Sequence, residues 1–162
     1  MKYAEGSPIR SEFFKFTVST GRWSQMAVEG ARPLARAFAD TVLRTTEAGP
    51  QAIGAGWYLH GGVGAGGNTY LNDLWFLSHA GAWTEHPRSI SAPASVMGAL
   101  WYFRGYLFLW QGYDLEGGFS PKLDAHLGMW TCAEQQDGSV TQWEQLKPVS
   151  SHRNWRIWRR GR

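Results

Sequence analysis

The sequence contains little cysteine, little charge and no long apolar run. Its single cysteine, Cys132, can form no internal disulfide and no cysteine-based metal cluster. No segment approaches the roughly 18 apolar residues of a membrane-spanning helix, and residues 1–10 lack the apolar run of a signal peptide. These absences predict a soluble chain without a membrane span and favour an intracellular location.

Charged residues make up only 18% of the chain, and the formal net charge of +3 arises at one end. Of the 16 basic residues, five arginines lie in 152–162 without any acid, which leaves 11 basic and 13 acidic residues elsewhere. In this tail Trp155 and Trp158 alternate with arginine, a composition suited to stacking on nucleobases or to an anionic membrane. The tail is equally compatible with an irregular terminus, so nucleic acid and membrane are expected partners only weakly and only there.

Tryptophan and glycine are abundant, and three of the ten tryptophans mark an internal repeat. Trp23, Trp83 and Trp143 are separated by 60 residues, and each is followed by a short polar stretch. Such composition predicts many short packed segments joined by glycine turns, and tryptophans with matching flanks indicate an array of similar units. The equal spacing is partly accidental, because insertions in different loops cancel.

The segments before the three tryptophans predict strands of matching order. Residues 13–23 align with 73–83, which places Phe14 over Leu74 and Phe16 over Phe76. The third copy, 128–143, has a longer hairpin with its tip at 135–138, where Asp-Gly favours a tight turn. Strands are also expected at 56–62, 105–112, 96–104 and 39–45, the chain turning back at 104–105. The segment 27–39 is interpreted as a loop between repeats, and a short helix after Pro33 is the alternative.

These residues resemble the Kelch repeats of β-propeller proteins. The best copy has the Gly61-Gly62 pair after an apolar strand, then an Asn-Asp-Leu-Trp strand ending in Trp75, then Trp83. The third copy departs from the pattern, with Gln111-Gly112 in place of the double glycine. The resemblance implies all-β blades of four antiparallel strands around an axis. Its structural markers are Trp23, Gly61, Gly62, Trp75, Trp83, Gly112, Trp130 and Trp143.

The repeats predict an N-terminal segment at 1–11, an array at 12–150 and the basic tail at 151–162. Within the array we expect a half blade at 12–28 and blades at 39–88 and 93–147. Because propellers usually need four to eight blades, this partial propeller has too few to close alone. It is expected to be a fragment of a larger propeller or to associate with itself through open blade faces.

The sequence predicts no catalytic residue, metal site or cofactor. The segment 62–67 matches G-x-G-x-x-G, but an extended segment follows it instead of the helix that binds a pyrophosphate, so a blade loop is predicted. None of the five histidines pairs with another ligand at a metal-site spacing: His60, His79, His86, His126 and His152. Cys132 is interpreted as a small buried residue of a strand.

The predicted function is therefore a protein-interaction scaffold whose partner is a protein of unknown identity. The inserted loop 113–123 is the preferred binding site, because aromatic and charged residues together suit an interface. Its candidate residues are Tyr113, Asp114, Glu116, Phe119 and Lys122. The alternative is a fragment of a Kelch-like propeller enzyme or sugar-binding domain similar to the central domain of galactose oxidase.

Overall fold

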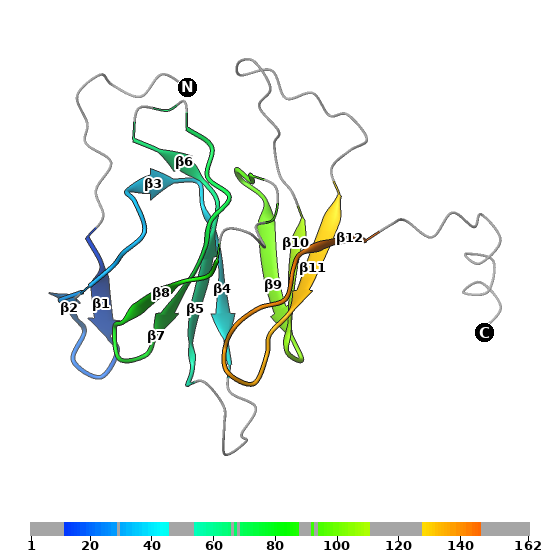
Figure 1. Ribbon diagram of the computed structural model, residues 1–162. Coiled ribbons are helices and arrows are strands. Elements are labelled where there is room, and N and C mark those ends of the chain that lie inside the picture. Colours follow the sequence, from blue (N-terminus) through cyan, green and yellow to red (C-terminus); the bar gives the residue numbers. More distant parts are fainter. Residues whose placement is uncertain are drawn as a thin grey trace, which may run out of the picture.

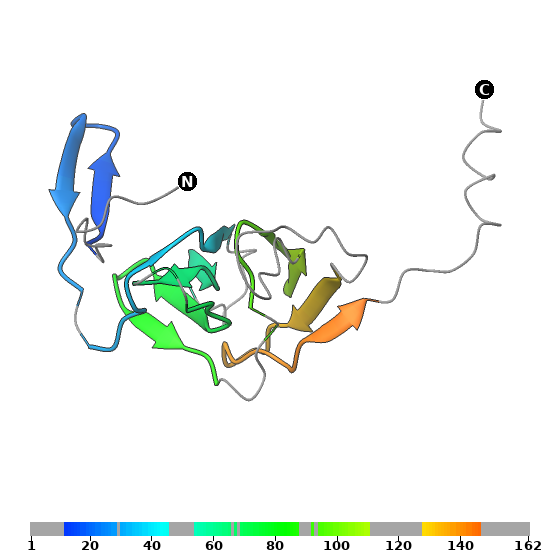
Figure 2. The same cartoon turned by 90° about the horizontal axis from the view of Figure 1, so that it is seen from above.

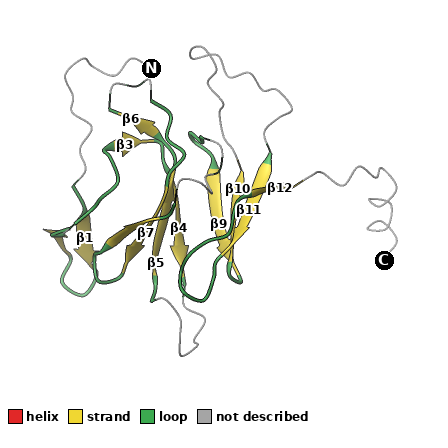
Figure 3. Ribbon diagram, viewed as in Figure 1, coloured by secondary structure: helices red, strands yellow, loops and turns green. Residues whose placement is uncertain are grey.

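The computed structural model describes residues 12–28, 30–45, 54–65, 67, 69–87, 92, 94–110 and 128–146. These residues form twelve strands and no helix, which confirms the all-β prediction (Figure 3). Within this described part, no helix is long and apolar enough to cross a membrane.

Two four-stranded antiparallel sheets form the body of the molecule (Figure 1). The first sheet has the order β4 (Asp40–Arg44), β5 (Gly56–His60), β7 (Leu74–Ser78) and β8 (Trp83–Glu85). The second has the order β9 (Ala99–Phe103), β10 (Tyr106–Trp110), β11 (Met129–Ala133) and β12 (Glu144–Leu146). Four-stranded antiparallel sheets are what the repeat predicted, and neither sheet closes on itself.

Alternating side chains and glycine turns explain how the second sheet forms. Along β10, Leu107 and Leu109 are buried whereas Tyr106 and Trp110 are exposed, the period of a strand with two different faces. Arg104 and Gly105 both have positive φ, 49° and 80°, which suits the tight turn between β9 and β10. The predicted hairpin tip also forms, because the Gln135 amide donates a 2.7 Å hydrogen bond to the Ser139 carbonyl.

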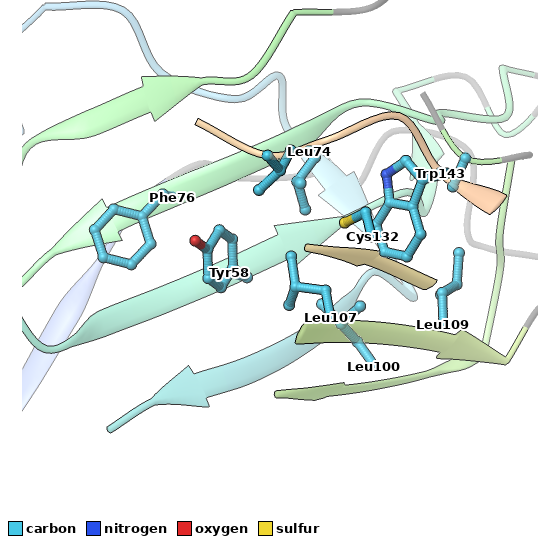
Figure 4. Packing of buried hydrophobic residues seen from close by; sticks show 10 residues of the cluster. Tyr58, Leu74, Phe76, Leu100, Leu107, Leu109, Cys132 and Trp143 are labelled. Atoms are coloured by element: carbon cyan, nitrogen blue, oxygen red, sulfur yellow. The ribbon is translucent and has the colours of Figure 1, made fainter. Parts of the chain in front are cut away.

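The main core lies between the two sheets. Tyr58 of the first sheet and Leu107, Leu109 and Cys132 of the second are at most 2% exposed and belong to one apolar cluster (Figure 4). Trp143 is also buried there, just before β12. Burial of these large apolar side chains is the main force that holds the sheets together.

A separate hairpin precedes the first sheet. Its strands are β1 (Phe14–Thr17) and β2 (Arg22–Gln25), and it projects away from the two sheets in Figure 2. At its base, the ring of Phe13 lies 5.1 Å from that of Trp83. Phe16 pairs with Trp23, and Leu77 pairs with Trp83, so Phe16 is the structural equivalent of Leu77. The sequence alignment, which placed Phe16 over Phe76, was wrong by one residue. The turn of this hairpin is one residue longer than that between β7 and β8.

A two-stranded ladder joins segments that were predicted to be loops. In it, β3 (Arg36–Ala37) pairs with β6 (Val63–Gly64), and Tyr70 forms a further bridge to Val63. The segments 27–39 and 62–67 are thus not wholly loops. A two-residue ladder depends on backbone groups, so no side-chain periodicity marks it in the sequence. No helix follows 62–67 among the described residues.

Candidate functional site

The outer side of the second sheet carries a surface of large apolar side chains. We call it the open face, and it consists of Trp101, Phe103, Tyr106, Phe108, Trp110 and Met129. Five of these residues are between 41% and 61% exposed, and Phe108 is partly exposed between them. Because β9 and β10 are antiparallel, Trp101 lies directly opposite Phe108, and Phe103 lies opposite Tyr106. Contiguous exposed apolar surface of this kind usually marks an interaction site.

Strand pairing relates the open face to a buried face of the first sheet. Tyr58 pairs with Phe76 on β7, and Phe108 pairs with Thr131 on β11. The two positions are equivalent when Trp83 and Trp143 are superposed, because Phe76 pairs with the residue after Trp83 and Thr131 pairs with the residue after Trp143. Tyr58 is 1% exposed because the second sheet covers it. The equivalent position in the second sheet, Phe108, has no sheet above it among the described residues.

The residues two positions further along the strands, His60 and Trp110, are equivalent in the same way. His60 pairs with Asp40 and Leu74, and Trp110 pairs with Ala99 and Met129. His60 is fully buried, whereas Trp110 is 43% exposed. The open face therefore has the position and the apolar chemistry of an interior face.

A polar cluster around Glu134 joins the two sheets beneath this surface. The carboxylate accepts hydrogen bonds from the hydroxyls of Tyr58 at 2.5 Å and Tyr102 at 2.6 Å. Arg44 approaches both carboxylate oxygens, at 2.9 and 2.8 Å, and also donates to the Gly54 carbonyl at 3.0 Å. The Arg44 and Glu134 side chains are 8% and 4% exposed. The four side chains therefore bind one another and link β4, β5 and β9 to the end of β11.

Burial and charge shift the pKa values of both tyrosines and of Arg44 in this cluster. Burial raises the pKa of Tyr58 far above its ordinary value, and the hydrogen bond to Glu134 raises it further. The pKa of Tyr102 is raised by burial and by Glu134 in the same way. Burial opposes the charge on Arg44, but its hydrogen bond with Glu134 keeps its pKa above the ordinary value. Both tyrosines are consequently hydrogen-bond donors at neutral pH, which suits a structural role. A depression of about 360 Å³ lies beside the cluster, between Arg44 and Gly105.

The predicted double glycine forms a tightly packed corner of the first sheet. Gly61 and Gly62 have φ values of 65° and 95°. A Cβ at Gly61 would lie 2.5 Å from the Ser95 carbonyl oxygen, and one at Gly62 would lie 2.7 Å from that of Ala37. The backbone conformation and the close neighbours both require glycine here.

Asp73 is held in the same corner by three donors. Arg36 binds it through two nitrogens at 2.6 and 2.7 Å and also donates to the Gly61 carbonyl at 2.9 Å. The indole nitrogen of Trp75 donates to Asp73 at 2.7 Å. Although burial favours the neutral acid, the hydrogen bonds from Arg36 and Trp75 hold the pKa of Asp73 below its usual value. The repeat markers Gly61, Gly62 and Trp75 thus stabilise this corner of the fold.

Three further titratable side chains are buried: His60, Asp40 and Cys132. Burial lowers the pKa of His60 to about 4, so the imidazole is neutral at physiological pH. Asp40, its cross-strand neighbour, accepts a 2.7 Å hydrogen bond from Ser95, and burial raises its pKa. Burial also raises the pKa of Cys132 to about 12. No group of three or more metal-ligating side chains occurs among the residues that were described.

The residues predicted for binding lie outside the described part of the chain. These are Tyr113, Asp114, Glu116, Phe119 and Lys122, together with the marker Gly112 and the tail at 151–162. Among the other markers, Trp75, Trp83 and Trp143 are buried and Trp130 packs against the core, whereas Trp23 is 69% exposed. Sequence reasoning missed the open face, although aromatic residues at alternate positions of 101–110 signal a strand with two apolar faces. It also missed the Glu134 cluster, for which the sequence carries no local signal.

No protein-family model matches the chain, and no curated protein matches it. The fold and the open face therefore carry the functional argument.

Proposed function

We propose that the chain is a protein-interaction scaffold built from Kelch-type repeats, and that the open face binds another protein. The observation that carries this proposal is the equivalence of Phe108 and Trp110 with the buried Tyr58 and His60. Covering apolar side chains at interior positions with another sheet removes their surface from water, which is energetically favourable. Stacking of four-stranded antiparallel sheets face to face is also how the blades of a propeller pack.

The composition of the open face favours a protein partner. Protein interfaces are enriched in tryptophan, tyrosine, phenylalanine and methionine and depleted of charge at their centres. The open face has this composition, and the guanidinium of Arg104 beside it lies 5.1 Å from the ring centre of Phe103. Within each of the two buried polar clusters, around Glu134 and around Asp73, the side chains are hydrogen-bonded to one another. Both clusters therefore stabilise the scaffold and are not needed for recognition.

Site-specific photocrosslinking tests the proposal. A benzophenone amino acid at Phe108 should yield a discrete protein adduct in the cells that produce the chain, because the ring would lie within the interface. The same group at Ser139, on the exposed hairpin tip, is the matched control and should yield none. Adding Phe103→Lys to the Phe108 probe should abolish the adduct by placing a charge in the interface. The proposal fails if Phe108 gives no adduct, or if Ser139 gives the same one.

A second probe position tests the predicted binding loop separately. A benzophenone at Phe119 should crosslink to the same partner if the loop 113–123 contributes to binding. An adduct from Phe108 but none from Phe119 would restrict the interface to the sheet and remove the loop from the proposal.

A further inference from the structure

The chain already contains a folded example of the interface that the open face would form. Between its two sheets, the face that carries Tyr58 packs against the opposite face of the second sheet, which carries Leu107, Cys132 and Trp143. The open face is equivalent to the face of Tyr58. Its natural partner is therefore a sheet face equivalent to that of Trp143.

The β1–β2 hairpin carries such a face. The Met26 amide donates to the Phe13 carbonyl at 2.8 Å, as the His86 amide donates to the Leu74 carbonyl at 2.9 Å. The hairpin thus corresponds to β7 and β8, with Trp23 in the position of Trp83 and hence of Trp143.

The side chains on this hairpin face are exposed, unlike their equivalents in the first sheet. Phe16 and Trp23 are 45% and 69% exposed, whereas Leu77 and Trp83 are 7% and 9% exposed. Phe14, on the same face as Phe16, is 58% exposed. The rings of Phe16 and Trp23 lie 5.1 Å apart and form a small aromatic platform. Figure 2 shows the hairpin extending beyond the sheets, where a neighbouring molecule could contact it.

We propose that a second copy of this chain occupies the open face and binds it with its β1–β2 hairpin. This inference rests on the proposed function, since it names the protein that the open face binds. If each copy gives its hairpin to the other, two identical interfaces form and the assembly closes as a two-fold dimer. Each copy contributes the hairpin and two sheets, so the dimer contains six sheet positions, within the four to eight of known propellers.

The exposed area is sufficient for a stable dimer. With about 200 Å² for a large aromatic side chain, the open face and the hairpin together expose on the order of 900 Å² in each copy. A standard specific interface buries about 800 Å² on each partner. The two surfaces combined therefore match what a stable association needs.

Paired variants of the full chain test this arrangement by sedimentation and light scattering. The wild-type chain should be a dimer. A hairpin variant, Phe16→Ser with Trp23→Ser, and a face variant, Trp101→Ser with Phe108→Ser, should each be monomeric. An equimolar mixture of the two variants should restore a dimer, because one intact hairpin can still bind one intact face. The control Lys15→Ser with Arg22→Ser changes the other side of the hairpin and should stay dimeric.

Every result bears on the inference. A monomeric wild-type chain, a hairpin variant that still dimerises, or a mixture that stays monomeric would each overturn it. Circular dichroism and cooperative urea unfolding verify that the variants fold; the single changes Phe14→Lys and Phe103→Lys, both at exposed positions, replace any that do not. If Phe108 crosslinks to a different protein while the wild-type chain is monomeric, the proposed function stands and the dimer does not.

Discussion

The hydroxyl of Tyr58 donates a 2.5 Å hydrogen bond to Glu134, which joins a central strand of the first sheet to the end of β11 in the second. The two residues are 76 positions apart in sequence. Their bond crosses the apolar core, so it fixes how one sheet sits on the other while the surrounding side chains supply most of the stabilising burial.

Removing this bond should weaken the fold. We expect Tyr58→Phe to lower the free energy of unfolding by about 2 kcal/mol, because a buried carboxylate loses one of its donors. Urea denaturation followed by tryptophan fluorescence measures the change. Tyr106→Phe, at a 49% exposed tyrosine, is the matched control and should change stability by less than about 0.5 kcal/mol. Equal effects of the two changes would contradict the role of the Glu134 cluster.

Neutralising Glu134 should cost more than removing one donor. Glu134→Gln leaves Arg44 buried without its counter-charge, and we expect a loss of about 3 kcal/mol or more. In the Glu134→Gln background, Tyr58→Phe should have a smaller effect than alone, because the charged acceptor is already gone. Additive effects in this double-mutant cycle would show that the two residues are not coupled.

The double glycine should tolerate no larger residue. Gly62→Ala places a Cβ within 2.7 Å of the Ala37 carbonyl oxygen in addition to the strain of a positive φ. Gly67→Ala introduces the same kind of strain, at φ 77°, with no atom within 4 Å. The control should cost about 1–2 kcal/mol, and Gly62→Ala clearly more, as measured by thermal unfolding. Equal losses would mean that the corner relaxes to accept the methyl group.

Stability should fall as the solution is acidified below pH 6.5. His60 is neutral in the folded chain down to about pH 4, whereas in the unfolded chain it binds a proton near pH 6.5. Between pH 4 and pH 6.5 the unfolded state binds more protons than the folded state, so the free energy of unfolding increases with pH. The protein therefore loses stability as the pH falls through this range. The loss should reach about 3 kcal/mol. His86, whose pKa burial also lowers, acts in the same direction.

Urea denaturation at a series of pH values measures this dependence. His60→Gln should flatten most of the slope between pH 6.5 and 4 and leave the smaller share that comes from His86. Asp40 opposes the trend at the acid end, because its raised pKa makes the folded state take up a proton first. An unchanged slope in His60→Gln would show that His60 is not the source.

The buried thiol should report on opening of the core. Cys132 is 2% exposed and its pKa is raised to about 12, so it should react very slowly with a disulfide reagent in the native state. It is the single cysteine of the chain, and in urea it should react stoichiometrically. A fast native reaction would mean that β11 separates from its neighbours without global unfolding.

The sequence revealed the strands more readily than it revealed their contacts. Tryptophans at regular spacing and apolar runs ending in glycine located the strands of both sheets, and Arg104-Gly105 and Asp137-Gly138 located two hairpin turns. The register of the first hairpin was missed by one residue, because turn length determines register and aligned tryptophans do not reveal it. The β3–β6 ladder was missed since it depends on backbone pairing alone.

The polar core was beyond the reach of sequence reasoning for a different reason. Arg44 and Tyr58 come from one repeat and Tyr102 and Glu134 from the next, so the four side chains meet only when the sheets stack. Aromatic residues alternate with the leucines of β10, so the sequence could have predicted a strand with two apolar faces. It could not have shown which of the two faces a neighbouring sheet covers. The preferred loop at 113–123 remains a prediction.

One edge strand of each sheet affects how molecules of this chain can meet. β8 and β12 are only three residues long, and each contains a glutamate, Glu85 or Glu144. Short, charged edges offer little backbone for another chain to extend the sheet. A molecule with an apolar sheet face and one such edge on each sheet can associate through its faces while resisting addition of strands at that edge.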